Sequence, residues 1–296
     1  MRIQDRDVVV EGRFIKTVRL EHEWYEDLKD PESFVDAVRK SGVKADLVSF
    51  WQRFPETTPQ FKYFSESEDL AVLPVRSYDD WWNNRIKSRT RGMLRKTEKL
   101  GTVVRETQFD DDFIRGMVEI FNETPVRQGM PFWHYGKDFD TVKQQFSKFI
   151  FREDIIGAYY QDKLIGFVMM ANAGEYTLLG QILSMVEHRD KTPNNALIAK
   201  AVEVTARKQI PYLIYNSWKE TALTEFKRRN GFEKQSVPRY YVPLTALGSL
   251  CIRFGAHREL AHMFPKKLVF KLKEWRAAFY ARRHGSHTEK AVAQTD

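Results

Sequence analysis

The segment EHRDKTPNNALIAKAVE, residues 187–203, brings anion-binding groups to the start of a helix. It directly follows the apolar run QILSMV, so a strand is expected to end in a charged turn where a helix begins. The first N–H groups of a helix lack intrahelical partners, and the helix dipole adds about half a positive charge there. Side chains able to contact a phosphate lie in the same turn: Arg189, Lys191, Thr192 and Asn195. The pattern favours a bound anion, although a capped structural helix whose turn faces water fits it too.

Signatures of several other chemistries are missing from the sequence. There is no Cys/His cluster with metal-ligand spacing, no Walker loop and no Gly-x-Ser-x-Gly motif. Metal-dependent and nucleotide-hydrolysing chemistries are therefore not expected, and no residue is assigned to a metal. The single cysteine, Cys251, cannot form an internal disulfide, which fits a reducing compartment.

The composition predicts a folded protein without a membrane span or a signal peptide. Hydrophobic residues make up 42% and aromatic residues 14% of the 296 residues, which is enough for a core. No run approaches the ~18–20 apolar residues of a membrane span, and the N-terminus has no long apolar region. We expect a cytoplasmic protein.

The net charge of +8 is concentrated in two segments. Residues 246–296 hold ten Lys/Arg against four Asp/Glu, and residues 78–101 hold seven against three. Such clustering favours an anionic partner: a phosphate-bearing substrate, RNA or a membrane surface. Solvated helix faces explain either run about equally well.

Residues 1–77 are expected to form a β-rich region with one helix. The runs DVVVEGRFIKTVRL, KADLVSFWQRF and LAVLPV read as strands. The helix PESFVDAVRKSG opens at Pro31 and closes at Gly42. Residues 78–100 then read as one long basic helix that ends at Gly101.

From Gly101 onward, strands and helices alternate in a regular order. The strand TVVRETQ precedes two helices, DDDFIRGMVEIFNETPV and DTVKQQFSKFIF. IIGAYY, LIGFVMMAN and YTLLGQILSMV, joined by tight polar turns, predict an antiparallel meander. A helix from Pro193 to about Lys208, the strand YLIYNS, the helix WKETALTEFKRRN and the strand PRYYVPL complete the order.

Three helix ends carry recognisable caps. Thr192-Pro193 reads as an N-cap followed by proline at the first helical position. Ser217 with Glu220 reads as a capping box. Gly231 is expected to end the last helix as an αL cap, with Phe232 as its hydrophobic partner.

The order of elements from residue 101 to 244 resembles that of a GNAT acyltransferase domain, and the motifs resemble its FemAB-like branch. RTRGMLRKTEKLG (89–101) is similar to the Arg-rich helix of Fem-type peptidoglycan aminoacyltransferases and FemAB-like acetyltransferases. NETPVRQGMPFWHYG (122–136) resembles their Thr-x-x-Arg segment, and LTEFKRRNGFE (223–233) resembles their Phe-Lys-x-x-x-Gly-Phe ending. The resemblance implies an α+β fold in which helices flank a mixed, mainly antiparallel sheet.

The resemblance also implies three regions. Residues 78–245 would be the GNAT/FemAB-like acyltransferase domain. Residues 1–77 would be a smaller N-terminal α/β region, which could be a degenerate second GNAT-like half. Residues 246–296 would be a basic helical tail.

A GNAT-like domain implies a site where two central strands separate to admit the acyl donor. Here those strands are QILSMV and YLIYNS. In GNAT enzymes the turn after the first strand carries Gln/Arg-x-x-Gly-x-Gly/Ala, whose amides hold the pyrophosphate of coenzyme A. Arg189 fits this pattern, but Thr192 and Asn194 replace the glycines, so the backbone cannot approach a diphosphate as closely. The expected cofactor-binding residues are Arg189, Lys191, Thr192, Asn194, Asn195 and Ala196.

Acyl transfer to an amine needs a base for the ammonium proton, a group that polarises the carbonyl and an acid for the leaving group. Glu187 lies at a strand end beside His188, where a base acting through water could reach an acceptor. The resemblance implies that Tyr215, on the facing strand, is the acid. A core role for Tyr215 and a surface pairing of Glu187 with Arg189 are the alternatives.

Four residues are expected to bind substrate: Arg127, His134, Tyr135 and Lys227. In this fold the loop that holds Arg127 borders the acceptor, where a guanidinium could bind a carboxylate or phosphate. A loop anchored by an arginine salt bridge and stacked aromatics is the alternative. Lys227 resembles the Fem-family lysine near the donor, although lysines on short amphipathic helices are more often solvated.

The tail segment KKLVFKLKEWRAAFYARR (266–283) has an apolar stripe with cations around it. Such a helix could lie on an anionic membrane surface, or its stripe could dock on the catalytic domain. Peripheral contact with the inner face of the membrane is therefore a hypothesis.

The sequence as a whole predicts an N-acyltransferase that acts on an amine acceptor, either a small molecule or a cell-envelope or glycan precursor. Acyl-CoA is the first expectation for the donor, since most proteins of this fold use it. Fem-type enzymes also lack the glycine signature and use aminoacyl-tRNA, so tRNA is the rival donor. A catalytically silent scaffold that binds RNA or another partner is the non-enzymatic alternative.

Overall fold

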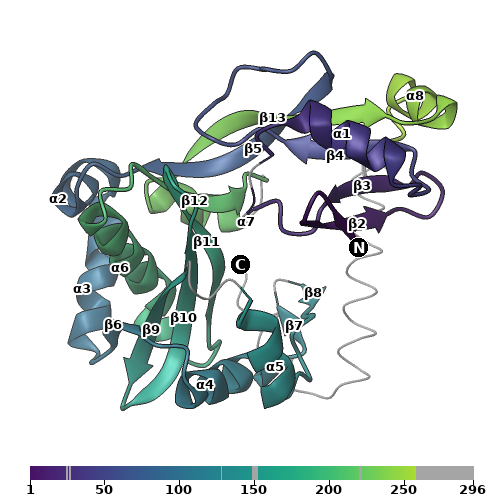
Figure 1. The fold of residues 1–296 in the computed structure, drawn as a ribbon. Coiled ribbons are helices and arrows are strands. Elements are labelled where there is room, and N and C mark those ends of the chain that lie inside the picture. The colour runs from purple at the N-terminus through teal and green to yellow at the C-terminus, as the bar shows by residue number, and fades with distance from the viewer. Residues whose placement is uncertain (25, 27, 128, 149–152, 220–221, 258–296) are drawn as a thin grey trace.

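The computed structural model describes residues 1–296 except 25, 27, 128, 149–152, 220–221 and 258–296 (Figure 1). The predicted tail helix at 266–283 therefore lies outside the described residues. Within them, no helix is long and apolar enough to cross a membrane.

One mixed sheet runs through the described part of the chain, with eleven strands in the order β1-β2-β3-β4-β13-β5-β12-β11-β10-β9-β6. Neighbouring strands are antiparallel except in the pairs β3–β4 and β11–β12. Strands from the first 77 residues thus share the sheet with later ones, and the division at residues 77 and 245 stays a prediction. The strands are β1 (Arg2–Ile3), β2 (Arg6–Glu11), β3 (Thr17–Leu20), β4 (Leu47–Trp51), β5 (Phe64–Pro74), β6 (Val103–Thr107), β9 (Glu153–Tyr160), β10 (Lys163–Asn172), β11 (Tyr176–Ser184), β12 (Tyr212–Ser217) and β13 (Glu233–Pro243). A separate hairpin pairs β7 (Val126–Arg127) with β8 (Met130–Pro131).

Helices cover both faces of the sheet around β10. Phe167 of β10 packs on Phe113 with ring centroids 5.7 Å apart, whereas a Cβ on the preceding Gly166 would lie 3.4 Å from Leu197. Because successive strand residues point to opposite faces, the helices holding Phe113 and Leu197 lie on opposite sides. The helices are α1 (Pro31–Lys40), α2 (Tyr78–Asp80), α3 (Ser88–Lys99), α4 (Asp111–Asn122), α5 (Phe139–Phe146), α6 (Pro193–Arg207), α7 (Ala222–Arg229) and α8 (Ala246–Arg253). The fold class is α+β with a mainly antiparallel sheet flanked by helices, as the sequence predicts.

The prediction of one continuous basic helix over residues 78–100 is wrong, because the structure has two helices separated by a break. After α2, residues Trp81–Arg85 form a π-helical turn, and Ile86 is extended at φ −105° and ψ 147°. Trp81 and Ile86 are both buried, and in a regular helix side chains five residues apart would point ~140° away from each other. The break lets both reach the core. Arg91 satisfies the freed carbonyls by donating to Trp82 O at 2.8 Å and Ile86 O at 2.7 Å.

Two predicted caps are also wrong. Thr192 precedes α6, but its backbone is left-handed at φ 49° and its side chain makes no capping bond. Its Oγ1 bonds instead to Thr97 Oγ1 at 2.8 Å and to Met93 O at 3.1 Å, because the packing of α3 on α6 takes that oxygen. Ser217 is the last residue of β12 rather than an N-cap of α7, and Glu220 lies outside the described residues.

The predicted end of α7 is confirmed. Gly231 has φ +89°, its N–H donates to Arg228 O at 3.1 Å, and the N–H of Phe232 donates to Lys227 O at 3.1 Å. This is the paired hydrogen bonding of a Schellman cap. The buried Phe232 ring then lies 5.9 Å from the Tyr215 ring, which fixes α7 over β12.

Replacing Gly231 with alanine tests this cap. Left-handed backbone costs a non-glycine residue about 1 kcal/mol, and a Cβ here would also lie 3.0 Å from Arg85 Cβ and 3.3 Å from Leu73 Cδ1. We expect Gly231→Ala to lower the free energy of unfolding by about 2–3 kcal/mol in a denaturant titration. Gly42→Ala is the matched control, because Gly42 has φ +72° and nothing within 4 Å. Equal losses in the two variants would contradict tight packing at Gly231.

Candidate active site

Strands β11 and β12 pair over a short stretch and then separate. Their parallel register holds for Tyr176–Tyr212, Thr177–Leu213 and Leu178–Ile214 only, although β11 continues to Ser184 and β12 to Ser217. Beyond Ile214, the register of β12 with its other neighbour, β5, shifts by a bulge. The sheet therefore opens at this point, which we call the strand split.

Charged groups occupy the end of β11 at the strand split. Glu123, directly after α4, accepts hydrogen bonds from the N–H groups of Val186 at 2.7 Å and Glu187 at 2.9 Å. Arg127 pairs with Glu123 at 3.0 Å and donates to Ser184 O at 2.8 Å. Burial is the main cause that lowers the pKa of the Arg127 guanidinium. Arg127 thus anchors its loop, and its role in substrate binding stays a prediction.

Lys227 occupies the end of β12 on the other side of the split. It is 3% exposed, its Nζ donates to Ser217 O at 2.8 Å, and Nζ lies 4.5 Å from the centre of the Tyr215 ring. Burial lowers the pKa of Lys227 to about 8. A lysine ammonium has three donors, so two remain after the bond to Ser217. The solvated lysine considered as an alternative is wrong.

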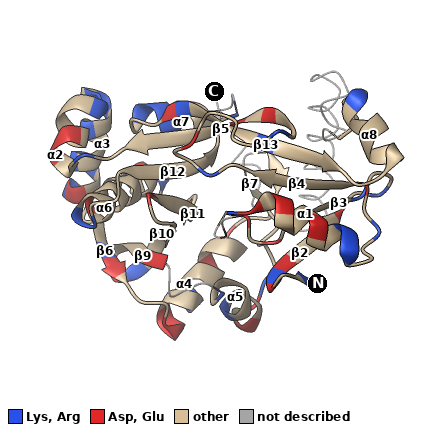
Figure 2. Cartoon of the chain, turned by 45° about the horizontal axis from the view of Figure 1, so that its top comes forward, with Lys and Arg blue, Asp and Glu red and all other residues tan. Residues whose placement is uncertain are grey.

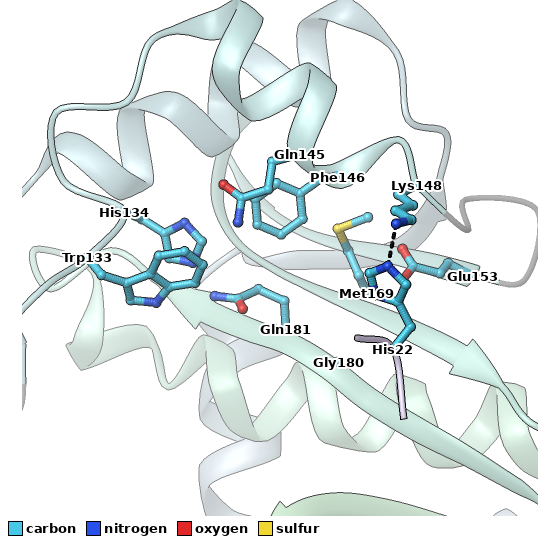
Figure 3. A pocket seen from close by; sticks show the side chains of 10 residues that line it. All are labelled: His22, Trp133, His134, Gln145, Phe146, Lys148, Glu153, Met169, Gly180 and Gln181. Atoms are coloured by element: carbon cyan, nitrogen blue, oxygen red, sulfur yellow. Dashed lines mark hydrogen bonds between the residues drawn. The ribbon is translucent and has the colours of Figure 1, made fainter. Parts of the chain in front are cut away.

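A pocket of about 230 Å³ lies along β11 just past the last pair with β12 (Figure 3). Met169 of β10 pairs with Gln181 and Met170 pairs with Leu179, so Gly180 is the extra residue of a β-bulge. Gly180 and Gln181 form one wall of the pocket. The other lining residues come from β9, β10, α5, the segments that precede and follow α5, and the N-terminal region: His22, Trp133, His134, Gln145, Phe146, Lys148, Glu153 and Met169.

His134 lines this pocket and packs among buried or half-buried phenylalanine rings. Its ring stacks on Phe121 with centroids 4.3 Å apart and planes 12° apart, and only 1% of the residue is exposed. Its Nδ1 lies 3.3 Å from Lys137 Nζ, whereas Nε2 is buried and has no hydrogen-bond partner among the described residues. Burial, reinforced by Lys137, lowers the pKa of His134 to about 3, so the ring is neutral at physiological pH. Tyr135, the next residue, is half-buried against the same core.

Most of the side chains at the start of α6 are buried or bonded to other parts of the chain. Thr192 bonds to α3 as described above, and Asn195 Nδ2 lies 3.4 Å from Asn230 Oδ1. Ala196 is buried. Asn194 Oδ1 is buried and lacks a hydrogen-bond partner among the described residues. Of these four predicted donor-binding residues, Asn194 therefore has an uncommitted polar atom.

The two predicted cations of the turn differ in exposure. Arg189 is exposed, while Lys191 lies against Tyr160 with Nζ 4.5 Å from the ring centre and 3.3 Å from Asp190 Oδ1. Most N–H groups before α6 are also bonded, to Glu123 at Val186 and Glu187 and to turn carbonyls at Lys191 and Thr192. The roles of these residues in donor binding stay predictions.

The two predicted catalytic residues lie on different sides of the split. Glu187 is exposed in the turn after β11, and Tyr215 is buried in β12, where burial raises the pKa of its phenol. No hydrogen bond joins them in the described part of the chain. The core role and the acid role of Tyr215 are compatible with this position, since a phenol with a raised pKa stays protonated.

Sequence reasoning missed Glu123 and the bulge at Gly180. A carboxylate just after a helix is unfavourable with the helix dipole, so Glu123 after DDFIRGMVEIFN was a signal that the side chain serves another purpose. Gly180 inside the apolar run YTLLGQILS was a second signal, because glycine inside a strand often marks a bulge.

Comparison with known proteins supports the fold. No family model and no curated protein matches the chain by sequence. Among solved structures, L-PGS from Bacillus licheniformis is similar over 84% of this chain and 85% of its own, at 12% identity and a TM-score of 0.57. FemX is similar over 78% and 83%, at 11% identity and a TM-score of 0.54. The C-terminal DUF2156 domain of a protein assigned as a lysylphosphatidylglycerol synthetase from Agrobacterium fabrum is similar over 83% and 82%, at 11% identity and a TM-score of 0.56.

These likenesses show that the chain shares its α+β fold with these proteins. At such low identity they establish the fold and leave the chemistry to be argued from the site.

Glu123→Gln tests whether the Glu123 carboxylate stabilises the turn after β11. The substitution removes the carboxylate that serves two backbone N–H groups and leaves Arg127, whose side chain is 11% exposed, without its charged partner. We expect a loss of about 2–3 kcal/mol in the free energy of unfolding. The control is Asp112→Asn on the same helix, where the Asp112–Arg115 pair is exposed and should leave the Tm unchanged. Equal stability of both variants would contradict the role given to Glu123.

Proposed function

We propose that this protein is an acyltransferase that carries an aminoacyl group from an ester donor to an amine acceptor at the strand split. The observation that carries the proposal is Lys227, a buried lysine that faces the split with free donors and a pKa lowered to about 8. Burying an ammonium without a carboxylate partner disfavours folding. Its position is explained if it stabilises negative charge that develops during a reaction.

The chemistry assigns a role to each side of the split. The acceptor nitrogen attacks the donor carbonyl, and the oxygen of the tetrahedral intermediate takes up negative charge. Lys227 donates to that oxygen while one of its protons stays on Ser217 O. Tyr215 supplies a proton to the leaving alkoxide, and Glu187 accepts the proton lost by the acceptor amine through a water molecule.

Two features favour an aminoacyl ester on tRNA over acyl-CoA. The N–H groups of Val186 and Glu187 are already bonded to Glu123, and the Thr192 side chain is bonded to α3, so few groups remain to hold a diphosphate. Helix α3, which packs against the start of α6, and its N-cap residue carry exposed cations without an ion pair among the described residues: Lys87 at the N-cap, and Arg89, Lys96 and Lys99 in the helix. In Figure 2, α3 and α7, both rich in Lys and Arg, lie at the same end of the molecule. Such a surface fits the phosphates of RNA.

The names of the solved structures agree with this proposal. FemX and lysylphosphatidylglycerol synthetase share the fold, and the sequence motifs resemble the Fem type. Acyl-CoA remains the donor predicted first from the sequence, and the donor experiment below separates the two.

Substituting Lys227 tests the proposed catalytic role. Lys227→Met should lower the transfer rate by at least ~100-fold, because a charged donor to the developing oxyanion is lost. The variant should keep a Tm close to that of the parent, because losing the bond to Ser217 O and removing the cost of burying the ammonium oppose each other. A variant that unfolds at a lower temperature and keeps its transfer rate would contradict the proposal.

The pH dependence follows from the same lysine. Its folded pKa of about 8 lies below the ordinary 10.5, so the ammonium form needed for transfer is lost as pH rises through about 8. The folded chain binds fewer protons than the unfolded chain between those values, so stability from this group increases as pH rises through that window. In Lys227→Arg, the residual activity should persist above pH 9, since a guanidinium stays charged. Identical pH profiles in both proteins would rule Lys227 out.

The donor is tested by binding and thermal shift. Lys96→Glu with Lys99→Glu should weaken tRNA binding at least tenfold in a filter assay and reduce the salt slope by about 2. Lys44→Glu with Lys62→Glu, which changes exposed lysines of the N-terminal region, is the charge-matched control and should bind as the parent does. Equal binding by both double variants, or a rise in Tm with acetyl-CoA, would overturn the tRNA donor.

A further inference from the structure

The pocket beside Gly180 is placed to hold the acceptor. It lies beside the part of β11 that no longer pairs with β12, so a nucleophile seated there would be next to the strand split. Its lining joins the sheet, the segment that precedes α5 and His22 of the N-terminal region. The nature of its side chains therefore bears on which acceptor the proposed reaction uses.

Trp133 presents a large apolar surface at this pocket. It is 67% exposed, which is unusual for tryptophan. The other tryptophans among the described residues are buried or half-buried. Lys137 Nζ lies 3.9 Å from the Trp133 ring centre and the His134 ring 3.8 Å, so contacts with these two neighbouring side chains hold the indole in place. An exposed aromatic side chain held in this way is suited to stack against a ring of a ligand.

The polar groups at the pocket are hydrogen-bonding groups rather than free cations. Lys137 can only donate, so Nδ1 of His134 is the acceptor and the proton of this neutral imidazole resides on Nε2. Nε2–H is thus a buried donor without a partner among the described residues, and it belongs to a side chain that lines the pocket (Figure 3). The Gln181 amide, on the bulged strand, can donate and accept.

The charges of the lining disfavour an anionic acceptor. Lys148 is paired with Asp7 at 3.6 Å and bonds to His22, and Lys137 donates to Gln145 Oε1 at 2.5 Å. Glu153 adds a carboxylate to the lining, which repels carboxylates and phosphates. The pocket thus suits a neutral, hydroxyl-rich ring.

We propose that the acceptor bound in this pocket is an amino sugar. Its ring stacks on Trp133, one hydroxyl oxygen accepts from His134 Nε2–H, and Gln181 bonds to another hydroxyl. Its amine lies toward Gly180, where it attacks the donor carbonyl. An N–C amide bond forms, the C–O ester bond breaks, and the proton lost by the amine ends on the released hydroxyl, so no oxidant or further reactant is needed. The identity of the group transferred rests on the proposed function, whereas sugar binding does not.

Ligand-observed saturation-transfer NMR on the full chain tests this proposal without a donor. D-Glucosamine and D-glucose should both receive saturation, strongest at ring protons, whereas L-lysine, an amine with a carboxylate, should receive none. Saturation of L-lysine without the sugars, or of none of the three, would overturn the proposal. If the protein binds the sugars but transfers no aminoacyl group to glucosamine, the result would count against the proposed function and leave the sugar site in place.

Variants locate the binding. Trp133→Ala should abolish the sugar signal, while Phe14→Ala, which removes an aromatic side chain that is 78% exposed in the N-terminal region, should retain it. His134→Phe keeps the stacking and removes the N–H, so the Kd for glucosamine should rise about tenfold. Unchanged sugar binding in folded Trp133→Ala or His134→Phe would overturn the assigned contacts and with them the proposal.

Discussion

The separation of β11 from β12 leaves backbone groups that the sheet itself no longer satisfies, and charged side chains take them over. A buried N–H or C=O without a partner costs free energy comparable to a lost hydrogen bond. At the end of β11, Glu123 accepts from the N–H groups of Val186 and Glu187, and Arg127 donates to the carbonyl of Ser184. At the end of β12, Lys227 donates to the carbonyl of Ser217. The opening is thus held by ions instead of by strand pairing.

The charged side chains at the strand split affect both the stability of the fold and the polarity of the opening. Aliphatic side chains could close the sheet at lower cost, because buried charges lose hydration. Charged side chains instead keep the opening polar and supply donors beside it. The three helices around the opening are fixed to one another, since Thr192 of the α6 start bonds to α3, and Thr90 of α3 donates to the carbonyl of Arg229 in α7 at 3.0 Å. The groups at the split therefore do not depend on one flexible loop.

Much of the fold could be predicted from local sequence patterns. The meander β9–β11 follows from apolar runs separated by QDK and AGE, and the end of α7 follows from Gly231. The break at Ile86 could not be predicted, because it arises from burying Trp81 and Ile86 together in a core assembled from distant segments. The N-cap at Thr192 failed for the same reason: Thr97, 95 residues earlier in the chain, takes its hydroxyl.

The candidate site was predicted in part. The sequence identified both strands of the split and singled out Lys227, Arg127 and His134. It could not show that Lys227 is buried, because a lysine on an amphipathic helix has the same local pattern whether it points to solvent or to a neighbouring strand. Nor could it reveal that Glu123 reaches the turn after β11, 63 residues further along the chain.

Hydrogen–deuterium exchange, with and without a non-hydrolysable 3′-amide analogue of aminoacyl-tRNA, measures the strand split most directly. The account predicts that peptides covering residues 179–186 and 215–219 exchange faster than those covering 176–178 and 212–214 in the free protein, and slow down when the analogue is added. Uniformly slow exchange along both strands, or no change with the analogue, would show that the sheet is closed and that no donor enters there.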